Sequence, residues 1–468
     1  MTSSRRIFKN IFSLAAAEMI SKGVSLITIA YLARVIEPQG FGVIGFATAF
    51  LSYFGLLVNL GFDTLGTREV ARDNDRIKKY VDNIITIRLI MAVAGYIIFA
   101  VIVSMLDKPQ LVKSVLFITG LGLFANAFLL NWVFQGIERM EVIALRQILA
   151  SLFNLLGVLL LVHNSDDLLW AVSVTVFSNI INTIWMGAVY VKHFGMPGFD
   201  FDLPFWKDMF RSALPLAFSS FMIAIYYNMD MVMLGFMRNE TEVGYYSAAY
   251  KVLMLGLIPS GIILSSFFPQ LSIANGNRNR TISLMKKYST AMFIISGFIS
   301  VIGIAYASDI INLIFGKEFY QSIILLQILM INTLFVYINT TYGNPLLAWD
   351  KERPYTFAIA TGAVSNIILN FVFIPPYGAL GAAIATVASE AIVFIGLSYL
   401  HYKSVQTLYL NSLVKVLLIV IASMGIAYLI QYSGINIIIS FIVTTLIFCF
   451  FNLIFKTINL KELKEYLT

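Results

Sequence analysis

The sequence predicts an all-α integral membrane protein of about fourteen transmembrane helices, arranged as two six-helix lobes and two further C-terminal helices. The composition, the spacing of apolar segments and the placement of basic residues each indicate this class. Of the 468 residues, 59% are hydrophobic and 12% are charged, whereas soluble domains are about 45–50% apolar and about 25% charged. A soluble fold of this length could not hide so much apolar surface from water.

Long apolar segments recur along the chain at the length that a spanning helix needs, which is about 20 residues. Short breaks such as DKPQ and HNSDD separate some of them, and Pro375 and Pro376 end another because proline lacks a backbone donor. The first segment resembles a signal peptide, but its apolar character continues to about residue 35, which favours an uncleaved helix. The expected segments are 11–35, 41–65, 83–106, 111–135, 143–162, 168–190, 212–237, 244–270, 288–309, 322–348, 355–375, 378–400, 413–432 and 435–455.

Lysine and arginine fall mainly in alternate loops, as the positive-inside rule expects of a multi-pass protein. With the N-terminus in the cytoplasm, 24 of the 32 basic residues lie in cytoplasmic segments, four on the opposite side and four within spans. The bias predicts that both termini are cytoplasmic. It also explains the net charge of +7 through topology, without a nucleic-acid partner.

A faint internal repeat predicts how the helices are grouped. FGVIGFATAF, from Phe41, is similar to VGYYSAAYKV, from Val243, at an offset of about 202 residues. Because each half then holds an even number of helices, the halves form a parallel repeat about a pseudo-two-fold axis along the membrane normal, with a central cavity. The predicted parts are an N-terminal lobe at 1–190, a cytoplasmic inter-lobe loop at 191–211, a C-terminal lobe at 212–400, and two additional helices with a short cytoplasmic tail at 401–468.

The chain shows no pattern typical of an enzyme or an ATP-driven pump. It has no GxxxxGK[ST] phosphate-binding loop and no evident nucleophile–base set. Its single cysteine, Cys449, excludes an intramolecular disulfide, and its three histidines lack the spacing of metal ligands. No metal site and no catalytic residue are therefore expected.

Charges inside the predicted spans are the candidates for function. A charge near the bilayer centre costs about 2.5–3.5 kcal/mol, so such residues usually face a cavity or a partner. The candidates for substrate binding are Lys22, Arg34, Arg88 and Lys251, with Tyr250 as an aromatic surface for sugars. The candidates for ion coupling or charge pairing are Glu18, Asp63, Asp230 and Glu390.

The first-half candidates each have a structural alternative. Glu18 and Lys22 are spaced i, i+4 and could neutralise each other on one helix. Arg34 and Arg88 lie within two turns of helix ends, from which long basic side chains can reach the interface.

The second-half candidates also carry alternatives. Asp230 and Lys251 lie on either side of a helix–helix loop at a similar depth, about 10 Å in, so they could pair, or Lys251 could enter the cavity. Glu390 has no evident local partner, which favours a cavity role. Tyr250 could instead pack or belong to an interfacial aromatic belt.

Several strings resemble one family across nearly the whole chain and in the same order. They are LARVIEPQGFGVIGFATAF, GFDTLGTREVARD, NWVFQGIERM, YYNMDMVMLGFMRNETEVGYYSAAYKV and NPLLAWDKERPYTFAIATGAVSNIILNFVFIPPYGALGAAIATVASE. Together they resemble the O-antigen-type (Wzx-like) polysaccharide flippases of the multidrug/oligosaccharidyl-lipid/polysaccharide exporter superfamily. The signature positions are expected to serve packing, turns and loops: Gly42, Trp132, Gln135, Gly136, Asn366, Asn370, Gly378 and Gly381.

The resemblance implies a flippase in the bacterial inner membrane rather than an enzyme. It would carry undecaprenyl-diphosphate-linked oligosaccharide units, of O-antigen or a related surface polysaccharide, from the cytoplasmic to the periplasmic leaflet by alternating access. It implies roles in binding the diphosphate or coupling an ion for lumen-facing charges, here Lys22, Arg34, Asp63, Arg88, Asp230, Lys251 and Glu390. A polysaccharide polymerase and glycosyltransferases are plausible membrane partners.

No cofactor is expected, and the drive is left open. Two negative charges moving outward gain about 4.6 kcal/mol from an inside-negative potential of about 100 mV, while proton or sodium coupling through Asp230 or Glu390 is the competing drive. A multidrug cation antiporter of the same superfamily is the second hypothesis, although its cavity should be dominated by acids. The third is a membrane scaffold for polysaccharide assembly that transports nothing.

Overall fold

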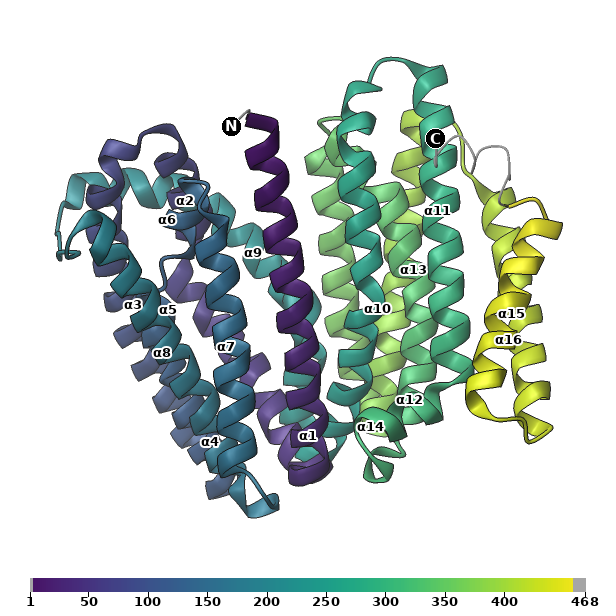
Figure 1. The fold of residues 1–468 in the computed structure, drawn as a ribbon, viewed down its shortest axis with the longest axis horizontal. Helices are drawn as coiled ribbons and strands as arrows, with labels where there is room; N and C mark the ends of the chain where they lie inside the picture. The colour runs from purple at the N-terminus through teal and green to yellow at the C-terminus, as the bar shows by residue number, and fades with distance from the viewer. Residues whose placement is uncertain (1–2, 458–468) are drawn as a thin grey trace. The chain divides into compact units, whose positions relative to one another are not determined.

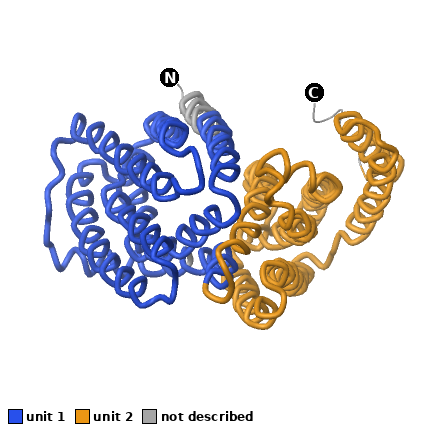
Figure 2. The backbone as a smooth tube through the Cα atoms, turned by 90° about the horizontal axis from the view of Figure 1, so that it is seen from below, with its two compact units in different colours: residues 1–235 blue, residues 236–468 orange. Residues whose placement is uncertain are grey.

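The computed structural model describes residues 3–457, with side chains from residue 16 onward except at position 219. Within this part of the chain every regular element is a helix. The chain divides into two compact units, residues 1–235 and residues 236–468 (Figure 2). The end of the predicted cytoplasmic tail, with Lys461 and Lys464, lies outside the described residues.

The described part of the first unit contains nine α-helices and two 3-10 turns, labelled in Figure 1 where space allows. The long α1 contacts α3, α4, α5 and α7, while α7 also packs on α8. The elements are α1 (Ser3–Asn59), α2 (Phe62–Arg72), η1 (Asn74–Arg76), α3 (Ile77–Met105), α4 (Gln110–Gly120), α5 (Gly122–Ala127), α6 (Asn131–Gly136), α7 (Met140–Leu161), η2 (Ser165–Asp167), α8 (Leu168–Phe194) and α9 (Leu203–Met237), whose last two residues belong to the second unit.

The second unit is built around α10, α11, α13 and α14, which contact one another. Helices α15 and α16 lie side by side at one edge of this unit, against α11 (Figure 1). The elements are α10 (Glu240–Ile273), α11 (Arg278–Ala305), α12 (Ala307–Ile314), η3 (Lys317–Phe319), α13 (Ser322–Ala348), α14 (Glu352–Val405), α15 (Leu410–Tyr432) and α16 (Ile437–Ile454).

Twelve helices of the described chain are long and apolar enough to cross a membrane. Two of the elements, α1 with 57 residues and α14 with 54, are more than twice as long as the about 20 residues that cross a bilayer core of about 30 Å. Both are kinked, α1 at Glu37 and α14 at Gly378, and these kinks lie at predicted breaks between segments. The prediction of an all-α membrane protein is confirmed, while the count of fourteen spans stays a prediction.

The kink in α14 depends on glycine and on an acidic side chain from the start of α10. Gly378 has φ 57° and ψ −133°, a conformation that L side chains rarely adopt, and a Cβ there would collide with Glu242. The Glu242 carboxylate accepts a hydrogen bond from the Ala379 amide at 2.8 Å and pairs with Arg238 at 2.9 Å. Arg238 in turn donates to the Pro375 carbonyl at 3.3 Å. These contacts satisfy backbone groups that the kink removes from the helical pattern.

The Trp-x-x-Gln-Gly string forms α6 and packs against α2. The Trp132 ring is 1% exposed and lies against Gly66, where a Cβ would overlap the ring. Gly136 lies similarly close to Val70, and the Thr67 hydroxyl donates to the Trp132 carbonyl at 3.3 Å. In the structure this string therefore makes a close helix–helix contact.

The segment between α8 and α9 is held against the start of α3. The Gly198 amide donates to Asp82 at 2.6 Å, and Asn83 both donates to Asp200 at 2.9 Å and accepts from the Trp206 indole at 2.7 Å. Asp202 pairs with Lys79 at 3.0 Å, near its hydrogen bond from the Phe205 amide. This loop is thus an ordered strap within the first unit.

Candidate functional site

A cavity of about 380 Å³ lies among α1, α2, α3 and α5 of the first unit. Its lining combines apolar positions with polar side chains that come from four separate elements. The polar lining residues are Thr48, Ser52, Asn59, Asp63, Arg88 and Asn126. Asn59 and Asp63 lie at the end of α1 and the start of α2, where a break at Leu60 and Gly61, both with positive φ, turns the chain.

Arg88 on α3 is the buried cation of this cavity. Its side chain is 3% exposed, and its guanidinium donates to Asp63 and to Asn59, both at 2.7 Å. A further, longer bond of 3.4 Å reaches the Leu129 carbonyl. Arginine suits such a site because its planar fork binds several acceptors at once. The guanidinium is therefore anchored inside the unit and does not extend to the interface.

Asp63 faces both its partner and the cavity. Its side chain is 49% exposed, and its second carboxylate oxygen accepts the Asn59 amide at 2.8 Å. The Asn59 side-chain oxygen also accepts the Asp63 backbone amide at 3.1 Å, so Asn59 holds both members of the pair. The local i, i+4 spacing of Asn59 and Asp63 places these groups on one side of the chain break.

This arrangement can respond to charge in the cavity. Asp63 compensates the buried guanidinium and is also open to the cavity. An anionic ligand that takes the place of this carboxylate keeps Arg88 compensated, which a buried cation needs. The cavity therefore offers an anion a guanidinium whose availability depends on one carboxylate.

The other first-unit candidates lie outside this cavity lining. Glu18 and Lys22 form an ion pair of 2.7 Å on α1, with side chains 54% and 47% exposed. Arg34 is exposed on the same helix, before the kink at Glu37. Asp230 on α9 is 4% exposed and within electrostatic range of the Tyr53 hydroxyl.

The second unit holds the remaining candidates. Glu390 on α14 is 3% exposed and accepts a hydrogen bond from the Asn339 amide of α13, which also donates to the Glu390 carbonyl at 3.0 Å. Lys251 is half-buried on α10. Its neighbour Tyr250 stacks on Tyr246, with ring centroids 5.8 Å apart. Asp230 and Lys251 belong to different units, so their predicted pairing stays a prediction.

Two amides in these arrangements were missed by the search for charged residues. Asn59 and Asn339 bind the buried charges directly. The i, i+4 spacing of Asn59 and Asp63 at a helix end is visible in the sequence and indicates that their side chains can meet. Nothing in the sequence links Asn339 to Glu390, because the two residues are 51 positions apart.

A family model described as "Polysaccharide biosynthesis protein" matches residues 7–275, more than half of the chain. The chain belongs to this family. A putative O-antigen transporter of Escherichia coli K12 is 23% identical over 84% of this chain and 96% of its own length. A capsular polysaccharide biosynthesis protein, CapF, of Staphylococcus aureus is 23% identical over 84% of this chain and 99% of its own length.

Solved structures show the same fold at low sequence identity. A lipid II flippase, MurJ, in an inward closed conformation matches 96% of this chain and 99% of its own, with a TM-score of 0.78 and 17% identity. An inward-facing multidrug resistance MATE transporter of the MOP superfamily matches 85% of this chain and 99% of its own, with a TM-score of 0.68 and 15% identity. The family model confirms the predicted polysaccharide family, and these structures confirm the predicted fold.

Proposed function

We propose that this protein flips undecaprenyl-diphosphate-linked oligosaccharide units, of O-antigen or a related surface polysaccharide, from the cytoplasmic to the periplasmic leaflet by alternating access. The observation that carries the proposal is membership of the polysaccharide biosynthesis family together with relatives, named as transporters, that match along almost their whole length. We place the protein in the bacterial inner membrane with both termini in the cytoplasm, as the loop charges predict.

The charges that line the Arg88 cavity favour a substrate with an anionic headgroup. Asp63 and Arg88 are the two charged residues that line it, so the cavity is balanced rather than acidic, which disfavours an antiporter for cationic drugs. In this proposal the diphosphate takes the place of the Asp63 carboxylate at Arg88, while the lipid tail stays in the bilayer. Lys22, Arg34, Lys251 and Tyr250 remain candidates for further contacts with the substrate, and Asp230 and Glu390 for ion coupling.

A reconstituted flipping assay tests the function. Purified protein is placed in liposomes with a short undecaprenyl-diphosphate oligosaccharide, and a membrane-impermeant sugar oxidant reports sugar exposed on the trans leaflet. The proposal expects protein-dependent exposure and no efflux of a cationic dye from matched liposomes. Dye efflux without sugar exposure would support the antiporter instead, and neither activity would favour the scaffold.

The drive is tested in the same liposomes. Moving two negative charges outward gains about 4.6 kcal/mol from an inside-negative potential of about 100 mV. We propose this potential as the drive, so valinomycin with equal potassium on both sides should slow net flipping while the pH gradient is held. Undiminished flipping under that treatment, with loss on collapse of the pH gradient, would assign the drive to protons.

A further inference from the structure

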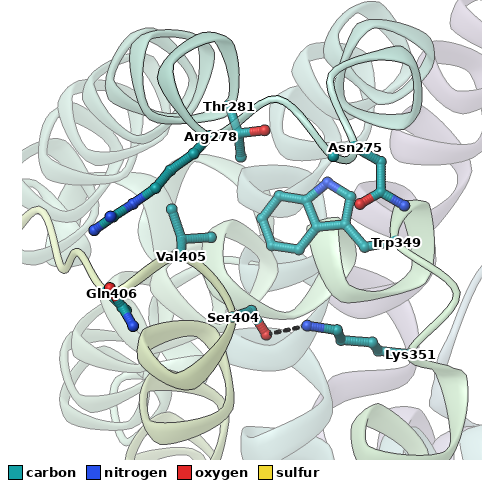
Figure 3. A pocket seen from close by; sticks show the side chains of 9 residues that line it. Asn275, Arg278, Thr281, Trp349, Lys351, Ser404, Val405 and Gln406 are labelled. Carbon is teal, nitrogen blue, oxygen red and sulfur yellow. Dashed lines mark hydrogen bonds between the residues drawn. The ribbon is translucent and has the colours of Figure 1, made fainter.

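A second cavity, of about 420 Å³, lies within the second unit and is independent of the Arg88 cavity. Figure 3 shows its lining side chains, which come from the α10–α11 corner, the α13–α14 corner and the end of α14. All three segments are helix ends, so the cavity opens where the unit leaves the membrane. The loop charges predict that this face is cytoplasmic.

The lining is polar and contains two cations but no carboxylate. Arg278 begins α11, and Lys351 immediately precedes α14. Among the described residues neither forms an ion pair, and the Lys351 ammonium is held by a hydrogen bond to the Ser404 hydroxyl at 2.7 Å. The neighbouring acids Asp350 and Glu352 do not line the cavity. The cavity lining thus holds two cationic groups and no carboxylate.

Trp349 gives this cavity a fixed wall. The residue is 6% exposed, its indole nitrogen donates to the Leu271 carbonyl at 3.2 Å, and its ring lies 5.8 Å from the His401 ring. Tryptophan is enriched at the depth of lipid headgroups because it has an apolar ring and a polar edge. Gln406 and Asn275 add side-chain amides that can donate hydrogen bonds.

We infer that this cavity binds a phosphate group, presented either by an anionic lipid headgroup of the adjoining leaflet or by free phosphate. Basic pockets between helices near the cytoplasmic face suit such headgroups, because several donors and cations converge on one anion. The ligand holds the three helix ends together and so stabilises the second unit. The site needs no transport activity, so it stands apart from the proposed flipping function.

A charge-matched pair of variants tests the site in the full-length protein. Arg278→Gln/Lys351→Gln removes both cations of the cavity. Arg280→Gln/Lys403→Gln removes two exposed cations of the same helices that do not line it. Both proteins lose two charges, so a general loss of attraction to anionic membranes affects them equally. Comparing their unfolding temperatures without ligand shows whether either one is misfolded.

Native mass spectrometry in a neutral detergent measures binding of phosphatidylglycerol, with zwitterionic phosphatidylcholine and uncharged diacylglycerol as comparisons. We expect the cavity variant to bind phosphatidylglycerol at least about tenfold more weakly than wild type, since each basic residue adds about 1 kcal/mol of attraction and 1.4 kcal/mol is tenfold. The matched variant should stay within about twofold. Equal losses in the two variants, or none in the cavity variant, would overturn the proposal.

Inorganic phosphate and pyrophosphate distinguish the two sources of the group. If either anion raises the unfolding temperature of wild type but not of the cavity variant, the site takes free phosphate. If phosphatidylglycerol alone does so, the site takes a lipid headgroup. If neither ligand stabilises wild type more than the cavity variant, the inference is wrong. Lys351→Arg, paired with wild-type Arg278, should retain binding because it keeps both cations.

Discussion

The two units treat buried charge differently. In the first unit Arg88 is 3% exposed, but its partner Asp63 is 49% exposed and faces a cavity of about 380 Å³. In the second unit Glu390 is 3% exposed and receives the Asn339 amide, without lining any of the cavities described above. The first arrangement faces a cavity that a ligand can enter, whereas the second is enclosed by its neighbours.

Because of this difference, similar intramembrane charges in the two units can serve separate steps of transport, namely headgroup binding and ion coupling. A charge beside a cavity can exchange its partner for an anionic headgroup, because both states keep the buried cation compensated. An enclosed carboxylate can change its protonation and thereby alter one interhelical contact. We therefore assign headgroup binding to the Arg88 cavity and keep Glu390 as a candidate for ion coupling.

The largest expected effect is the loss of Arg88 in the first unit. Arg88→Ala leaves the half-exposed Asp63 carboxylate and the Asn59 oxygen without their donor, and a hydrogen bond to a charged group contributes about 1.5–3 kcal/mol. A double-mutant cycle with Asp63→Ala, followed by denaturant titration in micelles, should show coupling well above about 1 kcal/mol. The exposed pair Arg139 and Glu141, at 3.0 Å, is the control and should couple by less than about 1 kcal/mol. Similar coupling in both pairs would contradict the buried-pair account.

The second effect concerns the kink of the second unit. Gly378→Ala places a Cβ against Glu242 in a backbone conformation that disfavours side chains, and such strain costs about 1–3 kcal/mol. Thermal unfolding should show a clear fall in stability. Gly425→Ala is the matched control in α15, because nothing lies within 4 Å of its Cβ, and it should be neutral or stabilising. An unchanged unfolding temperature for Gly378→Ala would show that a side chain at position 378 causes no backbone strain, against this account of the kink.

A smaller effect is expected at Glu390. Glu390→Gln keeps an oxygen acceptor for the Asn339 amide and should change stability by less than about 1 kcal/mol, whereas Glu390→Ala removes it and costs about 1–3 kcal/mol. If Glu390 couples an ion, Glu390→Gln should also abolish the pH dependence of flipping in liposomes. A pH profile identical to wild type would remove Glu390 from the coupling candidates.

The smallest effect lies in the strap of the first unit. The Phe205 amide and then Lys79 hold the pKa of Asp202 below its ordinary range. The stabilisation from Asp202 is therefore complete above about pH 4 and is lost as pH falls through the lowered pKa. Hydrogen exchange should show less protection at 198–202 in Asp202→Asn than in wild type at pH 7. The difference should shrink as the pH falls through the lowered pKa of Asp202, and a difference that stays constant down to full protonation would show that the Asp202 carboxylate does not stabilise the segment.

Much of the fold could be predicted from the sequence, because the features that indicate each helix, its apolar length and the prolines at its ends, are local. The span ends at 322–348 and 413–432 follow from apolar length, and α13 (Ser322–Ala348) begins and ends as expected. The helix break at Pro375 and Pro376 was also local, but the role of Glu242 in it was not, since the two sites are more than 130 residues apart. Asp63 and Arg88 were predicted individually, while their pairing and the part of Asn59 depend on packing between helices.

The most direct test of the central claim measures the apparent affinity for the lipid-linked oligosaccharide in the flipping assay. Asp63→Asn removes the carboxylate that competes for Arg88 and should strengthen binding, while Arg88→Gln should weaken it by about tenfold, the size of one charge-assisted hydrogen bond. Glu390→Gln should leave the affinity within about twofold of wild type. Unchanged affinity in both first-unit variants, with a large loss in Glu390→Gln, would contradict the assignment of headgroup binding to the Arg88 cavity.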